Sequence, residues 1–426
     1  MIGVALMGTL AAPDAQAGGF MLQEQSQLEI GRAFSGAAAS ADDPSTIWYN
    51  PAGMTELPGL QLSSGATALF VASRQEDVGT TITGPAPLGA RAVGGSDGGN
   101  PFIPVVPVPT GYASWQAGNS GLWLGVGVTA PFGLKLRYDS GFFGRYDSTY
   151  SNLLTLNAQP SIAWRLSDSV SFGAGLDIQY ADATLDSAWP QPSGASDGKA
   201  RLAGDDITLG WNAGVLVKLK GGARLGLHYR SDMEHDLKGR NTLSGFTGAL
   251  AVLNGSTAIR SPLTLPGSAT LSLSAPLNPE TRIMLTGRWY NWSAFDKLTV
   301  IFPSGTAVSK TYGYRDSWSV SAGLERRMSD RLTLRAGSMF DRTPTDPAWL
   351  STRVPDGNRT WLSGGVSYGL TGHLTLNASY AHVFIAGQTM NRMESFYGGS
   401  LSTSATIRSR QSGNVDMIAT SVTARF

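Results

Sequence analysis

Long stretches of this chain alternate apolar and polar residues with a period of two. Between Val170 and Tyr180, every second residue is apolar and the residues between them are small or polar. This alternation is typical of a β-strand with one apolar face. We count such segments at 59–74, 104–117, 121–138, 148–166, 169–187, 206–219, 222–239, 262–276, 281–302, 311–327, 331–342, 358–370, 373–389 and 411–426. An even number of strands lets an antiparallel barrel close with both ends on one side.

The connections between these segments alternate between short and long. The short joins include 118–120, 167–168 and 329–330. The long joins are 75–103, 139–147, 188–205, 240–261, 303–310, 343–357 and 390–410. Bacterial outer-membrane barrels combine short periplasmic turns with long outer loops, and a soluble β-sandwich has no reason to sort its loops in this way. We therefore predict an all-β fold, a 14-stranded antiparallel transmembrane β-barrel over residues 59–426.

Composition agrees with a membrane barrel and argues against other classes of protein. Only 15% of the 426 residues are charged, against about 25% in soluble domains. No uncharged apolar run approaches the ~20 residues of a spanning helix. A secreted array of β-sandwiches would share part of this composition. The net charge of +1 argues against a nucleic acid partner. The chain has no cysteine, and it has no Asp/His cluster at ligand spacing, so we expect neither a metal nor a cofactor.

The N-terminus carries a targeting signal and a segment of a different kind. Residues 1–17 form an apolar run that ends in Ala15-Gln16-Ala17, which is a small-x-small cleavage site, so we predict a signal peptide and a mature chain from Gly18. The expected basic residues are missing, which leaves open a start of translation further upstream. Residues 18–58 are too polar and interrupted to span a membrane and too short to be a domain. We interpret them as a hatch inside the barrel lumen.

The C-terminus ends in a strand with an aromatic last residue. Ile418, Val422 and Phe426 share one face of that strand. A terminal aromatic on the lipid face resembles the signal that outer-membrane barrels present to the barrel assembly machinery. We therefore expect this machinery to be a partner through Phe426.

Several short runs, taken in order, resemble the long-chain fatty acid transporter family, FadL and its TodX-like relatives that handle aromatic hydrocarbons. The runs are GRAFSG at 31–36, ADDP at 41–44, NPA at 50–52, APFGL at 130–134, GRY at 144–146, WSAF at 292–295 and PDGNR at 355–359. The resemblance covers the mature chain. It implies a barrel plugged from within that admits hydrophobic molecules across the bacterial outer membrane without its own energy source. It also implies contact with membrane lipid and lipopolysaccharide, and a monomeric state.

The tripeptide Asn50-Pro51-Ala52 is the sharpest feature of the predicted hatch. Asparagine tolerates turn geometry and proline fixes φ, so the residues alone favour a structural turn. The resemblance implies instead that the tripeptide lies in the lumen beside an opening in the wall, as a hatch gate.

The run Ala130-Pro131-Phe132-Gly133 interrupts the third predicted strand. Proline has no N–H and is tolerated within a sheet only at edges or bulges, and a closed barrel has no edge. The residues therefore predict a local break in the ladder, which is either a bulge near the rim or a lateral opening toward lipid. The resemblance favours the lateral opening.

Two outer loops and two inward cations are candidate ligand-binding features. The apolar loop residues are Trp189 in 188–205 and Phe246, Leu250 and Leu253 in 240–261. They indicate either a capture site for an apolar ligand or packing between loops. By strand parity Arg288 and Arg315 face the lumen, where they suit a fatty-acid carboxylate or an ion pair with a hatch carboxylate such as Glu24, Asp42 or Asp43.

The histidines do not indicate an enzyme. His228 and His235 share one strand, with no distinctive nucleophile nearby, and His373 lies beside a short turn. We expect passive uptake of hydrophobic small molecules by loop capture, lumenal binding and lateral exit. The alternatives are a structural or adhesive barrel and a general porin. The sequence does not distinguish a fatty acid from an alkane or an aromatic ligand.

Overall fold

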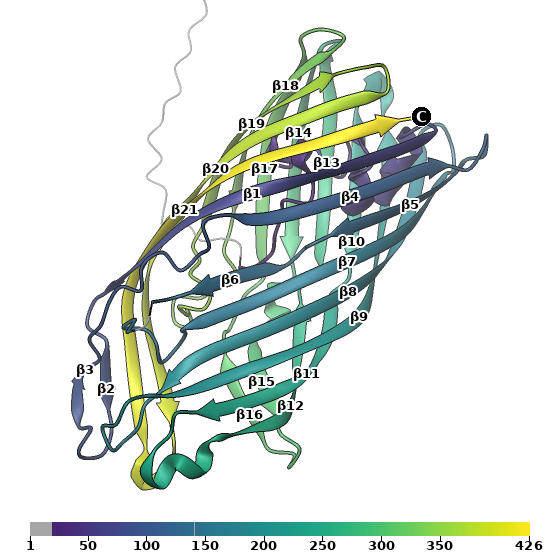
Figure 1. The fold of residues 1–426 in the computed structure, drawn as a ribbon. Coiled ribbons are helices and arrows are strands. Elements are labelled where there is room, and N and C mark those ends of the chain that lie inside the picture. The colour runs from purple at the N-terminus through teal and green to yellow at the C-terminus, as the bar shows by residue number, and fades with distance from the viewer. Residues whose placement is uncertain (1–18, 140) are drawn as a thin grey trace, which may run out of the picture.

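The computed structural model describes residues 19–139 and 141–426. Neighbouring strands pair antiparallel, and the sheet closes on itself because the first strand, β1 (Leu60–Asp77), pairs with the last strand, β21 (Thr403–Arg425). The result is a closed barrel of 14 antiparallel strands, as predicted (Figure 1). The predicted signal peptide, residues 1–17, lies outside the described residues. The strands are β1 (Leu60–Asp77), β2 (Thr81–Thr83), β3 (Ala90–Ala92), β4 (Val106–Gln116), β5 (Leu122–Thr129), β6 (Gly133–Arg137), β7 (Tyr150–Arg165), β8 (Val170–Trp189), β9 (Gly198–Lys218), β10 (Arg224–Arg230), β11 (Met233–Ser244), β12 (Gly255–Leu265), β13 (Ser268–Asn278), β14 (Thr281–Tyr290), β15 (Lys297–Ile301), β16 (Ala307–Thr311), β17 (Ser317–Arg327), β18 (Leu332–Asp341), β19 (Arg359–Gly369), β20 (Leu374–Phe396) and β21 [Thr403–Arg425].

Several wall strands are interrupted part-way along their length. The segments β5 and β6 form one wall strand, and so do β10 with β11, β12 with β13, β14 with β15, and β16 with β17. The short strands β2 and β3 form a hairpin that pairs with the outer part of β21. Four 3-10 helices occupy connections, η2 (Lys220–Gly222), η3 (Gly248–Leu253), η4 (Trp292–Ala294) and η5 (Gly399–Leu401).

Some strands extend further outward than the alternation predicts. Strand β9 begins at Gly198 rather than at position 206. Strand β20 ends at Phe396 rather than at position 389, and β21 begins at Thr403 rather than at position 411. The predicted loop 240–261 is largely strand, because β11 runs to Ser244 and β12 starts at Gly255. Beyond the apolar band the outward face meets water, so the hydropathy pattern fades while the backbone ladder continues.

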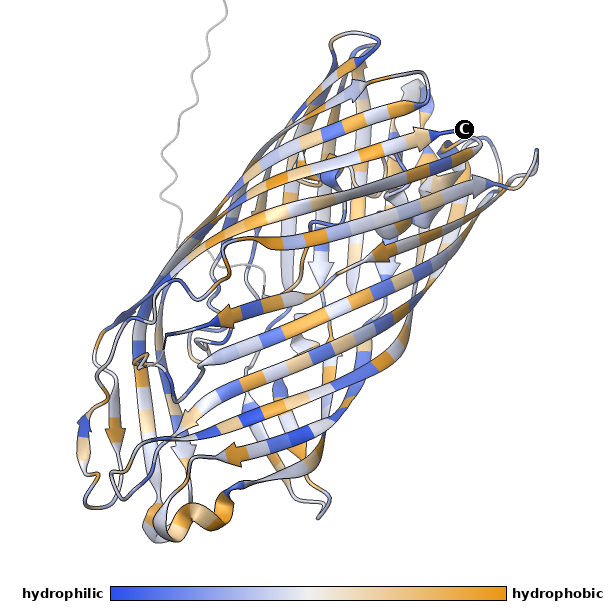
Figure 2. Ribbon diagram, viewed as in Figure 1, coloured by the Kyte–Doolittle hydropathy of each residue, from blue (hydrophilic) through white to orange (hydrophobic). Residues whose placement is uncertain are grey.

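The outer and inner faces of the wall differ in chemistry. Outward residues such as Leu209 and Val128 are 63% and 53% exposed. Inward residues such as Asn212 and Ser161 are buried and polar. Along each strand the apolar and polar residues alternate (Figure 2). An apolar outer belt over a small, polar inner face is the arrangement that lipid outside and a filled lumen inside require.

Residues 19–58, called the lumenal segment below, lie inside the barrel (Figure 1). They contain α1 (Gln27–Ile30), α2 (Thr46–Tyr49) and the 3-10 helix η1 (Pro51–Glu56). No helix in the described part of the chain is long and apolar enough to cross a membrane. Glycines on the inner wall let the two backbones approach closely, since a Cβ at Gly226 would collide with the carbonyl of Ala38 and one at Gly337 with the backbone of Arg32.

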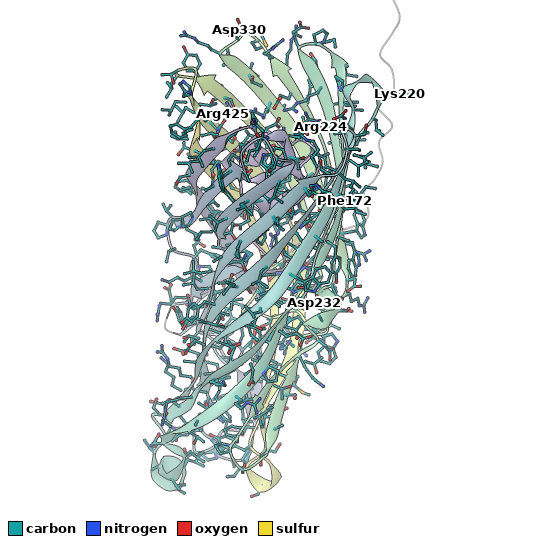
Figure 3. The ribbon with its side chains drawn as sticks, turned by 90° about the vertical axis from the view of Figure 1, so that its right-hand side faces the viewer. Phe172, Lys220, Arg224, Asp232, Asp330 and Arg425 are labelled. Carbon is teal, nitrogen blue, oxygen red and sulfur yellow. The ribbon has the colours of Figure 1, made fainter. Side chains whose placement is uncertain are left out.

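A charged network fixes the lumenal segment near the end of the barrel with short turns. Arg32 Nη1 lies 2.7 Å from Asp42 Oδ2, and Arg282 Nη2 lies 2.6 Å from Asp42 Oδ1. Figure 3 shows Arg224 and Arg425 near this end, below the turns marked by Lys220 and Asp330. Arg224 donates to the carbonyl of Ser40, and Arg425 donates to that of Asp42.

Candidate ligand passage

The wall is discontinuous where β5 ends and β6 begins. Strand β5 pairs with both β4 and β7, whereas β6 pairs along its length only with β7. The interruption falls at Ala130, Pro131 and Phe132, and Gly133 is the first residue of β6. Within the described residues, an isolated bridge between Phe102 and Leu136 is the only strand pairing that joins the outer part of β6 to the chain before β4. Pro131 lacks the N–H that a continuous ladder requires, which accounts for the break at this position.

The start of the lumenal segment covers this interruption from the inside. Leu22 N donates to Pro131 O at 2.8 Å, and Gly133 N donates to Phe20 O at 3.0 Å. Between these bonds, Met21 and Phe132 form an antiparallel bridge. The side chain of Gln25 also bonds to both backbone groups of Ala130. The broken wall strand is therefore completed by non-covalent contacts with residues of the lumenal segment.

Phe20 lies in a box of aromatic side chains that fills the middle of the lumen. Its ring centroid is 4.9 Å from that of Trp292 and 5.3 Å from that of Phe295. Phe132 and Tyr314 are each 6.3 Å away. Trp292, Phe295 and Tyr314 come from the interruptions between β14 and β15 and between β16 and β17. These interruptions turn large rings inward at the level of the wall break.

An apolar cavity of about 120 Å3 lies between the start of the lumenal segment and the wall. On one side it touches β1, and on the other it touches Gly133 and Leu134 of β6, so it borders both sides of the discontinuity. Most of its lining is apolar. Its polar lining includes Glu24, Asp356 and Arg359.

A larger vestibule of about 570 Å3 lies toward the outer end of the barrel. This volume is in the range of sites that hold small organic ligands. Its wall combines apolar side chains with three cations, Lys310, Arg353 and Arg392, and with the carboxylate of Glu394, which pairs with Lys310 and Arg392. The apolar lining includes Leu185, Trp189, Leu202, Leu298, Val300, Phe302, Trp349 and Phe396.

The buried carboxylate of Asp147 holds the vestibule cations in place. Asp147 lies in the connection between β6 and β7 and accepts from Lys310 Nζ at 2.8 Å and from Thr352 N at 2.7 Å. Burial alone would raise the pKa of Asp147, but Lys310, Arg392 and Arg353 outweigh it and hold the pKa well below its usual range. Asp147 is therefore ionised. It joins its own connection, between β6 and β7, to Lys310 of β16 and to the connection between β18 and β19.

The structure places Asn50-Pro51-Ala52 away from the wall break. Asn50 Nδ2 donates to Val215 O of β9 at 3.0 Å and to Ala38 O at 2.8 Å, and Asn50 Oδ1 accepts from Ala52 N. The backbone of Pro51 and Ala52 lies against Gly173 of β8. The tripeptide starts η1 and anchors it to β8 and β9, so it does not lie beside the interruption as the resemblance implied.

The four apolar loop residues that were predicted to bind ligand do not lie together. Trp189 lines the vestibule. Phe246 is buried against Trp189, with ring centroids 6.5 Å apart, which is packing between loops. Leu250 and Leu253 belong to η3, and neither lines the vestibule. Leu253 is 36% exposed. Among the four predicted loop residues, the vestibule lining therefore includes Trp189 and not the tip of the 240–261 loop.

The two predicted lumenal arginines also differ in position. Arg288 faces inward and is 9% exposed. Arg315 is 75% exposed and pairs with Asp346, so the inward placement predicted for it is wrong. It lies in the irregular stretch between β16 and β17, where the period of two does not hold. Sequence reasoning missed Phe20, Lys310, Arg353 and Arg392.

Comparison with known proteins gives the family. Residues 8–426 match the family described as "Outer membrane protein transport protein (OMPP1/FadL/TodX)". The chain belongs to the FadL/TodX family. It is 29% identical to the long-chain fatty acid transport protein of Escherichia coli O6:H1 (strain CFT073), over 89% of this chain and 90% of that one. It is also 29% identical to outer membrane protein P1 of Haemophilus influenzae (strain KW20), with coverage of 88% and 87%.

Solved structures of FadL/TodX proteins share the fold. A Pseudomonas aeruginosa FadL homologue superposes with a TM-score of 0.88 at 23% identity, covering 96% of this chain and 100% of that one. The Pseudomonas putida toluene transporter TodX gives 0.68 at 18% identity, with coverage of 97% and 99%. The protein is thus an outer-membrane β-barrel of a transport family.

Proposed function

We propose that this FadL/TodX protein takes up long-chain fatty acids or hydrocarbons passively, through the vestibule, the aromatic box and the apolar cavity. The ligand leaves sideways at Ala130-Pro131-Phe132-Gly133, between β4 and β6. The observation that carries this proposal is that Phe20, Met21 and Leu22 line the apolar cavity and also form the backbone bonds that bridge the wall break. When these residues move away, the cavity and the break form one passage. The curated relatives named for fatty acid transport support the ligand class.

Lateral exit suits an apolar ligand energetically. A chain with roughly 400 Å2 of apolar surface loses about 10 kcal/mol if it must enter water, at about 25 cal/mol per Å2. A route from the lumen directly into lipid avoids that loss. The lumenal segment meanwhile fills the path that a general porin would need, with Arg32, Phe34 and Ile47 fully buried inside the barrel.

The placement of the histidines supports a transporter rather than an enzyme. His228 lies 3.5 Å from Asn212, and His235 lies 3.1 Å from Gln179. His382 pairs with Asp416 on the outer face of the wall. None of these contacts joins a histidine to a serine or threonine nucleophile. A purely structural or adhesive barrel would have no use for a vestibule with apolar and charged walls above an apolar cavity.

The expected partners follow from the outer surface. The apolar belt meets membrane lipid, and the strands that continue above it meet lipopolysaccharide. Phe426 is 70% exposed at the end of β21, which suits recognition by the barrel assembly machinery. The ladder closes between β1 and β21, in keeping with a monomer.

A disulfide across the bridge tests the proposal. Met21 and Phe132 are paired without mutual backbone bonds, a geometry with Cα atoms about 4.5 Å apart that a disulfide can span. The chain has no other cysteine. The variant Met21→Cys with Phe132→Cys should take up a radiolabelled C16 fatty acid when reduced and lose most uptake when oxidised. Equal uptake in both states, with the cross-link verified by mass spectrometry, would overturn the proposal.

A further inference from the structure

A second, smaller cavity of about 30 Å3 lies behind the start of the lumenal segment. It shares Met21 and Leu22 with the apolar cavity, so these two residues form the partition between the two spaces. Its lining is also largely apolar, and the wall contributes charged side chains to it, those of Asp177, Arg230 and Arg288. We call it the polar chamber.

One of the two arginines in the polar chamber has a carboxylate partner and further hydrogen-bond acceptors within the protein. Arg230 pairs with the carboxylate of Asp177. Its Nη2 also donates to Gln159 Oε1 at 3.0 Å and to Trp48 O at 2.9 Å. Its guanidinium lies over the ring of Trp48, 3.6 Å from the centroid. Arg230 therefore has an anion and several acceptors of its own.

Arg288 has only neutral partners. Its Nε donates to Thr270 Oγ1 at 3.1 Å, and its Nη1 makes long contacts to Gln23 Oε1 at 3.4 Å and to the Tyr290 hydroxyl at 3.5 Å. Within residues 19–139 and 141–426, no carboxylate oxygen lies within 4.0 Å of it, and no acceptor faces its Nη2. Asp341 is connected to it only through Gln23, whose Nε2 donates to Asp341 Oδ2 at 2.9 Å.

A guanidinium that is 9% exposed and lacks a direct counter-charge carries a desolvation cost. Its planar donors can form two parallel hydrogen bonds with a carboxylate or a phosphate, and of these two a carboxylate is the head group of the proposed fatty-acid ligand. The nearest competing acceptor, Gln23, belongs to the lumenal segment next to Leu22. Movement of that segment removes the Gln23 contact and opens the partition in one step.

We propose that the polar chamber is an anion site in which Arg288 holds the carboxylate head of an amphiphile whose chain lies in the apolar cavity. The chamber, at about 30 Å3, has no room for an alkyl chain, whereas the apolar cavity next to it is larger, at about 120 Å3. This inference rests on the proposed function and adds a subsite to it. A small free carboxylate such as acetate has the same chemistry but gains nothing from the apolar cavity.

The test compares ligands that differ only at the head. Purified barrel in non-ionic detergent is titrated with radiolabelled hexadecanoate, hexadecanol and acetate. The variants are Arg288→Gln, Arg288→Lys and a control, Arg315→Gln, whose guanidinium is exposed. Correct folding of each variant is checked by heat-modifiable migration. Loss of a charge-assisted hydrogen bond should weaken hexadecanoate binding to Arg288→Gln by about tenfold or more.

The expected pattern is specific to the head group. Hexadecanol binding should be the same in all variants, Arg288→Lys should retain most of the hexadecanoate affinity, and Arg315→Gln should match the unmodified protein. Equal weakening of hexadecanoate and hexadecanol by Arg288→Gln, or no weakening of either, would overturn the anion site. Acetate binding that depends on Arg288 as strongly as hexadecanoate binding would overturn the amphiphile as its occupant. Failure of the unmodified protein to bind either C16 ligand would instead count against the proposed function.

Discussion

The backbone N–H of Gly19 donates a hydrogen bond to Asp356, with N and Oδ2 2.6 Å apart. Arg359 closes the arrangement, because its Nη2 donates to Gly19 O at 2.9 Å and to Asp356 Oδ1 at 3.0 Å. Asp356, in the connection between β18 and β19, and Arg359, at the start of β19, thus hold the first described residue of the lumenal segment by both of its backbone groups. This pair fixes the position of Phe20 in the aromatic box.

We predict that Asp356→Ala loosens the start of the lumenal segment without opening the wall. Removing the acceptor leaves Gly19 N unmatched and Arg359 without its counter-charge, so the segment should detach more often. Hydrogen–deuterium exchange of the peptide over residues 19–25 should become about tenfold faster or more, in line with about 1.5–3 kcal/mol for a bond to a charged group. The control is Asp346→Ala, which removes an outer carboxylate paired with exposed Arg315. Unchanged exchange in Asp356→Ala would show that the pair does not hold the segment.

Glu24 should make release of the lumenal segment depend on pH. Burial raises the pKa of Glu24 to about 7, against a smaller opposing effect of its backbone contacts and Arg359. Once released into water the group returns toward its ordinary value of 4.5. Ionisation therefore favours release, and the effect grows from about pH 4.5 to about pH 7 and is constant above that.

From about pH 6 to about pH 8 the population of the released segment should rise about tenfold. Exchange of the same peptide, corrected for the intrinsic pH dependence of amide exchange, measures this change. Glu24→Gln carries no charge in this range and should remove the dependence. A dependence that persists in Glu24→Gln would assign it to another group.

The sequence predicted the wall well and the lumen only in part. The break in the ladder at Pro131 could be predicted, because proline always lacks the backbone N–H that a ladder requires. The inward position of Arg288 followed from parity within a regular strand. Parity failed for Arg315, which lies in an irregular stretch, and it was not applied to Lys310 because β16 fell partly in a predicted loop. Phe20 could not be placed, since its partners lie more than a hundred positions away in the chain.

Deleting Phe426 should reduce the amount of assembled barrel in the outer membrane. Its side chain points outward and its backbone exchanges hydrogen bonds with Leu60, at 2.8 and 3.1 Å, where the barrel closes. Two effects are therefore combined in the deletion, loss of the terminal aromatic and loss of the last closing bonds. Phe426→Ala separates them, because it keeps the backbone. Heat-modifiable barrel in membrane fractions should fall in both variants, and wild-type levels in Phe426→Ala would show that the aromatic ring is not part of the assembly signal.

Asn50 should control how firmly the lumenal segment is held against β9, at a site remote from the wall break. Its side chain accepts from Ala52 N and donates to both Ala38 O and Val215 O, so it joins two parts of the segment to the wall. Asn50→Ala with Pro51→Ala removes these three side-chain bonds, each worth about 0.5–1.5 kcal/mol. The barrel strands make their own closed ladder, so heat-modifiable folding should persist. Exchange over residues 36–56 should accelerate, and fatty-acid uptake should fall because a displaced segment no longer aligns Phe20 with the cavity.

Asn100→Ala is the matched control, since Asn100 Nδ2 also donates to a backbone carbonyl, that of Val71, but on the outer face. Normal exchange and normal uptake in the double variant would reduce the tripeptide to a turn without influence on transport.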